Sequence, residues 1–173
     1  MSTDSNEKAI TPVVTLSALP LKSFSRGESY ASADNRVADA IGLTKLGATY
    51  SEVPPGKSGC PFHVHHGVDE MFVILEGQGR YRFGDATYEV RAGDVLGAPR
   101  GRAEFAHKLT NTGATPLKYL AISSVATNDL LEYPDSGKLM AVSDFGTDAE
   151  GFHFIGRANT ACGYWDDEPD SAD

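Results

Sequence analysis

Four of the five histidines in this 173-residue chain lie between residues 63 and 107. Three of them, His63, His65 and His66, fall within four positions, and Glu70 follows closely. Alternate residues of a β-strand share a face, so an extended segment directs His63 and His65 to one side and His66 to the other. Because imidazole nitrogens bind divalent metal ions, the pair at His63 and His65 predicts a metal site, with His66 in solvent.

Glu70 is a candidate carboxylate ligand for the same ion. Along a straight strand it does not share the face of His63 and His65, because an odd number of positions separates them. Gly67 lies between and can adopt conformations that bend the chain. A bend there would return the carboxylate toward the imidazoles, and Glu70 therefore belongs to the predicted site.

A third imidazole is expected from His107, on a distant segment. Residues 104–111 alternate in type, and an extended strand would place one set inside a barrel: Phe105, His107, Leu109 and Asn111. In that register His107 faces inward between apolar neighbours and joins the other predicted ligands. Glu104 faces outward by the same alternation, which argues against a ligand role for it.

The other chemically active side chains are expected to be structural. A single histidine is more often a hydrogen-bonded residue than a ligand, and His153 has no second ligand beside it in the sequence. Cys60 adjoins Pro61 and has the opposite parity to His63, so no thiolate ligand is expected there. Cys60 and Cys162 lie far apart without Cys-x-x-Cys spacing, which favours two free thiols.

The segments that must position these residues are short, rich in β-branched and aromatic residues, and closed by Gly, Pro or Asp. We expect strands over residues 46–53, 70–76, 79–84, 87–91, 94–98, 104–111 and 117–125, with hairpin turns at 76–80 and 84–85. Helical periodicity is too short to connect parallel strands, so the pattern predicts an antiparallel all-β sandwich or barrel. Four aromatic residues are expected to line its pocket, although their spacing is also typical of plain core: Phe72, Tyr81, Phe83 and Phe105.

The chain is long enough for one domain and too short for two comparable domains without a visible linker. We expect an N-terminal extension over 1–42 that can include an edge strand, a barrel over 43–126, and a C-terminal extension over 127–173 packed on the barrel. An apolar patch at Val13, Val14 and Leu16 could serve as an edge strand or a dimer contact.

The formal net charge is −9 and the Lys and Arg residues are spread singly, so no surface for nucleic acid is expected. No apolar run reaches the length of a signal peptide or a membrane span, which predicts a cytoplasmic location without a membrane partner. The expected partner is a small-molecule ligand or substrate.

These residues resemble the two sequence motifs of the cupin superfamily. The first motif is matched by His63, His65, Glu70 and Gly77, and the second by Gly93, Pro99, Gly101, His107 and Asn111. The gap from Gly101 to His107 is longer than the family's usual spacing, and Glu104 stands where the family normally has its histidine. We therefore place the extra residues in a looser turn after Gly101.

The resemblance covers residues 56–111 closely and 43–126 more loosely. It implies a double-stranded β-helix, or jelly-roll, barrel that holds one divalent metal ion, and it implies a homodimer. Stretches at 133–136 and near the C-terminus also resemble a group of single-domain bacterial cupins that are sometimes labelled sugar-phosphate isomerases.

Three imidazoles and one carboxylate suit Fe, Mn, Ni, Co or Zn, and the residue types do not choose among these ions. Four side chains around a tetrahedral zinc would close the site, whereas an octahedral ion keeps two positions for substrate. The leading hypothesis is a metal-dependent enzyme that acts on a small oxygenated molecule, sugar-like or carboxylate, by isomerisation or oxygen-dependent chemistry. The alternative is a non-catalytic cupin that binds a metal or small ligand, as a sensor does. The sequence assigns no catalytic acid or base.

Overall fold

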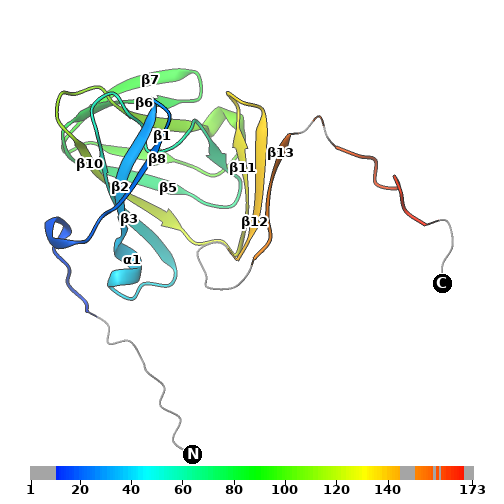
Figure 1. The fold of residues 1–173 in the computed structure, drawn as a ribbon, viewed down its shortest axis with the longest axis horizontal. Helices are drawn as coiled ribbons and strands as arrows, with labels where there is room; N and C mark the ends of the chain where they lie inside the picture. The colour runs from blue at the N-terminus through cyan, green and yellow to red at the C-terminus, as the bar shows by residue number, and fades with distance from the viewer. Residues whose placement is uncertain (1–10, 145–150, 158, 160, 170–173) are drawn as a thin grey trace, which may run out of the picture.

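The computed structural model describes residues 11–144, 151–157, 159 and 161–169, which are mostly β-strands (Figure 1). The helix α1 (Val37–Ala40) is short, and 3₁₀ turns occupy Leu16–Ala18 and Ala103–Phe105. Within these ranges no helix has the length and apolar character needed to cross a membrane. The strands are β1 (Lys22–Arg26), β2 (Tyr30–Arg36), β3 (Leu46–Val53), β4 (Val64–His65), β5 (Glu70–Glu76), β6 (Gln78–Phe83), β7 (Ala86–Arg91), β8 (Val95–Ala98), β9 (His107–Asn111), β10 (Leu117–Ser124), β11 (Asn128–Tyr133), β12 (Lys138–Ser143) and β13 (His153–Arg157).

The strands pair antiparallel in three sheets. A six-stranded sheet has the order β1-β2-β3-β10-β5-β8, a three-stranded sheet the order β7-β6-β9, and a four-stranded sheet the order β13-β12-β11-β4. The main core draws apolar side chains from the first two sheets, for example Ile74 and Leu117 from one and Leu109 from the other. Burial of each such side chain contributes about 1.5–3 kcal/mol. The predicted all-β barrel is confirmed.

At Gly77 the chain passes from the six-stranded sheet to the three-stranded sheet, so the hairpin predicted at 76–80 is wrong. β5 pairs with β10 and β8, whereas β6 pairs with β7 and β9. Gly77 has a φ of +85°, and a Cβ there would lie 2.8 Å from the Pro116 carbonyl oxygen. Glycine alone fits this corner without strain. The turn predicted at 84–85 is confirmed, because β6 and β7 pair across it.

The segment before His107 departs from the strand predicted over 104–111. Ala103–Phe105 forms a 3₁₀ turn, and β9 begins only at His107. The Phe105 ring folds back over Gly101, where a Cβ would lie 2.4 Å from a ring carbon. Because the bare glycine backbone admits the ring, the chain closes a turn here, as the looser spacing after Gly101 predicts. From the first residue of β9 the predicted alternation holds, with three buried side chains: His107, Leu109 and Asn111.

Both ends of the chain add strands to these sheets. β1 and β2 extend the six-stranded sheet beyond β3, while β11 pairs with β4 and places Leu131 opposite His65. The apolar patch at Val13, Val14 and Leu16 precedes β1 and forms no strand, so β1 itself is the edge of the sheet. The strands β11, β12 and β13 were not predicted, because the alternating pattern weakens after residue 126.

Candidate metal centre

Three sheets meet at the predicted ligands. His63 directly precedes β4, His65 lies on β4, Glu70 opens β5 and His107 opens β9. The backbones of His63 and His107 exchange two hydrogen bonds, in which the His63 N–H donates at 3.1 Å and the His107 N–H donates at 2.7 Å. This pairing holds the two rings side by side, with centroids 4.7 Å apart.

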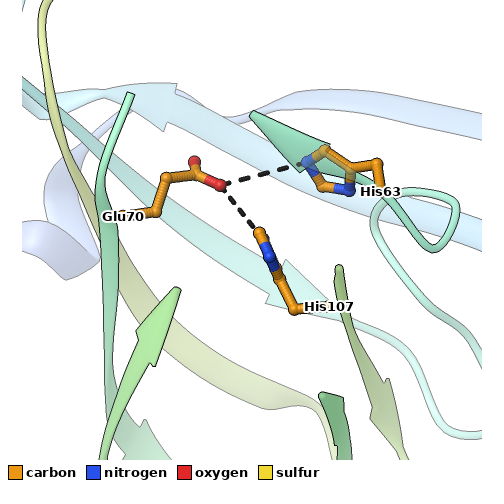
Figure 2. Close-up of side chains that lie close together, drawn as sticks. All are labelled: His63, Glu70 and His107. Carbon is orange, nitrogen blue, oxygen red and sulfur yellow. Dashed lines mark hydrogen bonds and ion pairs between the residues drawn. The ribbon is translucent and has the colours of Figure 1, made fainter. Parts of the chain in front are cut away.

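The imidazoles converge on one carboxylate oxygen. Oε2 of Glu70 lies 3.1 Å from Nε2 of His107, 3.4 Å from Nε2 of His65 and 3.9 Å from Nε2 of His63. Figure 2 shows the carboxylate directed at the rings of His63 and His107. The ligand atoms of His63, Glu70 and His107 all lie within 4.8 Å of one another, so this group could hold a metal ion.

The opposite edge of each ring faces a hydrogen-bond acceptor. Nδ1–H of His63 donates to the Pro61 carbonyl at 2.9 Å, and Nδ1–H of His65 donates to Oδ2 of Asp129 at 2.5 Å. Nδ1 of His107 likewise faces a backbone carbonyl, at 3.4 Å. A proton on Nδ1 leaves Nε2 with a lone pair, so the rings of His63 and His65 present acceptors to the centre of the cluster.

The cluster therefore gathers three Nε2 atoms and a carboxylate around one point, and Nε2 of His107 and Oε2 of Glu70 share a hydrogen bond at 3.1 Å. Buried acceptors crowded together repel one another unless a proton or a cation lies between them. Histidines that bind metals characteristically donate their second N–H to a carboxylate or a carbonyl, which fixes the tautomer. The hydrogen bonds of the His63 and His65 rings are typical of metal-binding histidines.

Electrostatics favour the metal-binding states of two of these side chains. Burial, followed by the neighbouring His107 and His65, lowers the pKa of His63 to about 4. Burial would raise the pKa of Glu70, but the hydrogen bond with His107 and the nearby imidazoles outweigh it and lower that pKa. At neutral pH His63 is thus uncharged and Glu70 is ionised, as metal binding requires. Burial would also lower the pKa of His65, yet Asp129 and Glu70 outweigh it and raise that pKa.

Asp129 belongs to this site, and the sequence analysis missed it. Its buried carboxylate accepts the His65 Nδ1–H through Oδ2 and the Gly67 N–H, at 2.8 Å, through Oδ1. A Cβ on Gly67 would lie 3.2 Å from Oδ1, so glycine permits this close approach. A signal existed in the sequence, because Asp129 shares strand parity with the apolar Leu131. An acid at an inward position needs partners.

The remaining candidates lie outside the cluster. His66 turns away from it and pairs Nε2 with Oε1 of Glu132 at 2.6 Å, which leaves it half-buried instead of fully solvated. His153 is exposed on β13. Sγ of Cys60 lies 3.8 Å from Nδ1 of His63, the nitrogen that does not face the carboxylate. Both cysteines are free thiols.

Glu104 is exposed in the 3₁₀ turn, away from the converging imidazoles. We expect Glu104→Gln to leave metal content and melting temperature unchanged, since such surface substitutions alter stability by about 0.5 kcal/mol or less. Elemental analysis of the purified variant, together with a thermal scan, checks this. A variant that lost its metal would place the ligand in the turn after Gly101 instead of at His107.

A cavity of about 890 Å³ opens over the cluster. His63, His65 and Glu70 form part of its wall, together with the polar side chains of Thr49 and Tyr133. His107 does not line the cavity, and its side chain is only 3% exposed. A ligand in the cavity would therefore approach the cluster from the side of His63, His65 and Glu70.

The aromatic residues predicted to line the pocket do not line this cavity. Phe72 and Tyr81 are buried in the main core, and the Phe72 ring lies 5.5 Å from the His107 ring. Phe105 packs beside Phe83, with ring centroids 6.0 Å apart. Tyr81 and Phe83 border only a smaller hollow of about 360 Å³. Phe72 and Tyr81 instead face the main core, and Phe72 packs beside His107, the candidate ligand that does not line the cavity.

Comparison with known proteins agrees with this geometry. Residues 49–123 match the family model of the cupin domain. This segment of the chain is a cupin domain. All four clustered side chains lie within the matched cupin segment, whereas Asp129 lies beyond it.

Individual cupins resemble this chain over different lengths. An oxalate-binding protein from Thermotoga maritima is 35% identical over 71 residues, which cover 41% of this chain and only 55% of that relative. The structure of a candidate sugar phosphate isomerase from Acidithiobacillus ferrooxidans has a TM-score of 0.74 at 22% identity, covering 87% of this chain and 94% of that one. The structure of a predicted oxalate decarboxylase from Thermotoga maritima has a TM-score of 0.57 at 27% identity, covering 66% and 99%. These similarities confirm the double-stranded β-helix.

Proposed function

We propose that this cupin is a metal-dependent enzyme acting on a small oxygenated molecule. The observation that carries the proposal is the convergence of three Nε2 atoms on the Glu70 carboxylate in the wall of a cavity. A bound divalent ion, Fe, Mn, Ni, Co or Zn, would supply Lewis acidity to a carbonyl or carboxylate oxygen. The residues that would hold it are His63, His65, Glu70 and His107.

The chain's own residues prepare the site for this chemistry. The rings of His63 and His65 are held in the tautomer that binds metal, because Nδ1 of each faces an acceptor. The ring of Tyr133 stacks on the His63 ring at 6.1 Å, and Tyr133 also lines the cavity. Burial raises the pKa of Tyr133, so its phenol stays protonated at neutral pH and can donate to a substrate oxygen. Isomerisation requires a positioned proton donor or acceptor, so the place of Tyr133 in the cavity wall favours an enzyme over a protein that only binds its ligand.

One observation favours a second candidate, a protein that binds a metal-chelated anion without turnover. The relative with 35% identity is an oxalate-binding protein, and oxalate is a dicarboxylate that can chelate a metal ion. The likeness supports the binding step shared by both candidates. Catalysis separates them.

Calorimetric titration of metal-loaded and metal-free protein with oxalate and with gluconate tests the shared step. We expect binding only to the loaded protein, together with a higher melting temperature, because a ligand at 100 times its Kd stabilises by about 2.7 kcal/mol. Equal affinity of the two protein forms would contradict a metal-borne site. Incubation of the loaded protein with sugar phosphates in D₂O then separates the candidates: deuterium incorporated at carbon indicates an isomerase, and unchanged ligand indicates a binding protein.

A further inference from the structure

Part of the cavity wall comes from outside the segment that matches the cupin family. Arg36 and Asp39 contribute to the wall from before residue 49, and Leu131 and Tyr133 contribute from after residue 123. The shared segment carries the metal-binding cluster, whereas these outer residues shape the space in which a ligand lies. Ligand selection is therefore expected to depend on the outer residues.

Sheet order places Arg36 three strands away from Glu70 of the cluster. Arg36 pairs with Thr49 of β3, while Glu70 of β5 pairs with Ser123 of β10. All four of these residues line the cavity. The strands run in the order β2-β3-β10-β5, so three spacings of about 4.8 Å, about 14 Å in all, separate the backbones of β2 and β5. Glu70 and Arg36 both line the cavity that bridges this span.

The guanidinium of Arg36 keeps its terminal nitrogens available. Nε of Arg36 contacts Oδ2 of Asp39 at 2.8 Å, and the structure gives this side chain no other partner among the described residues. Both side chains are more than half exposed, at 59% and 56%, so the pair is weak. Asp39 contacts the Nε edge of the guanidinium, which leaves the two Nη groups to bind a ligand. These two groups are the parallel donors that suit a carboxylate or a phosphate.

Arg36 is also the single Lys or Arg among the described residues that line this cavity. Resting on the function proposed above, we infer that Arg36 forms a second subsite, which binds an anionic group at the far end of the ligand. The ligand class is then a polar molecule with chelating oxygens at one end and a phosphate or carboxylate at the other. A cavity of about 890 Å³ suits a sugar acid phosphate and far exceeds the size of oxalate.

Three six-carbon probes test the subsite on metal-loaded protein by calorimetry. Gluconate has a chelating hydroxy-acid end and a neutral far end, 6-phosphogluconate adds a phosphate there, and glucarate adds a carboxylate. We expect one of the charged probes to bind about 10-fold or more tightly than gluconate, the size of a charge-assisted hydrogen-bonded contact. In Arg36→Gln this preference should fall to about one, and the preferred probe identifies the anion.

Lys45→Gln is the matched control, because it removes the same charge from an exposed residue outside the cavity lining. It should retain the preference. The subsite is refuted if the charged probes bind no better than gluconate, if Arg36→Gln keeps the preference, or if Lys45→Gln loses it equally. Failure of all three probes to bind the loaded protein would overturn the proposed function and the subsite with it, which distinguishes that result from equal binding of the three.

Discussion

Replacing His63 by Ala should reduce metal affinity by about 100-fold or more. Loss of an outer hydrogen-bond partner of a ligand typically costs 10-fold to 100-fold in affinity, and loss of the ligand itself should cost at least as much. His63 lies in the cavity wall with its Nε2 directed at Glu70, so the substitution removes a donor atom without opening the main core. Metal content after dialysis against a defined chelator, measured per chain, gives the result.

His66→Ala provides the control from the same stretch of chain. His66 pairs with Glu132 on the far side of the strand, and its loss leaves the converging imidazoles in place. Metal content should stay near that of the parent protein. Retention of metal by the His63 variant, or its loss from the His66 variant, would show that the side chains bind in another register.

Asp129→Asn should weaken metal binding by about 10-fold to 100-fold, although Asp129 contacts Nδ1 of His65 and not the converging Nε2 atoms. The carboxylate accepts one hydrogen bond with each oxygen, from His65 Nδ1–H and from Gly67 N–H. An asparagine has one acceptor oxygen, so its NH₂ group must face one of these two donors. A buried donor left without an acceptor lowers the free energy of unfolding by about 1–3 kcal/mol. If the His65 ring rotates instead, its Nε2 no longer points toward Glu70. A metal titration and a denaturant melt of the metal-free protein together measure both effects.

Glu132→Gln is the companion variant for Asp129→Asn. Both acids lie on β11 and both accept from a histidine, but Glu132 holds His66, which is not a predicted ligand. Metal affinity should therefore be close to that of the parent protein. If both variants lost metal equally, the effect would come from loosening β11 as a whole, and the specific role of Asp129 in orienting His65 would be wrong.

Short-range patterns in the sequence predicted what depends on backbone geometry alone. Strands at 46–53 and 70–76 have the predicted bounds, because β-branched and aromatic runs between turn residues favour extended backbone. The opposite directions of His65 and His66 follow from the two-residue repeat of a strand. The same repeat identified His107 as the buried histidine of β9.

The errors occur where a contact outside the two-residue repeat of a strand decides the conformation. The corner at Gly77 depends on the Pro116 carbonyl, and the 3₁₀ turn at Ala103–Phe105 depends on a ring that folds over Gly101. Neither contact can be read from alternation along one segment. The pocket-lining role predicted for Phe72 fails similarly, since parity shows that a side chain faces inward without showing which space lies there.

By itself, the sequence predicted an all-β barrel from residue type and strand spacing. Strand parity and the resemblance to the cupin motifs together predicted the four side chains expected at a metal ion. Only the tertiary structure decided which atoms converge, which ring edges are held by acceptors, and that Asp129 and Arg36 belong to the site and its cavity. The physical reason is that β4, β5 and β9 belong to three different sheets, and β11 and β2 reach them from opposite ends of the chain. Side chains so far apart in sequence are brought into contact only by the pairing and packing of the sheets.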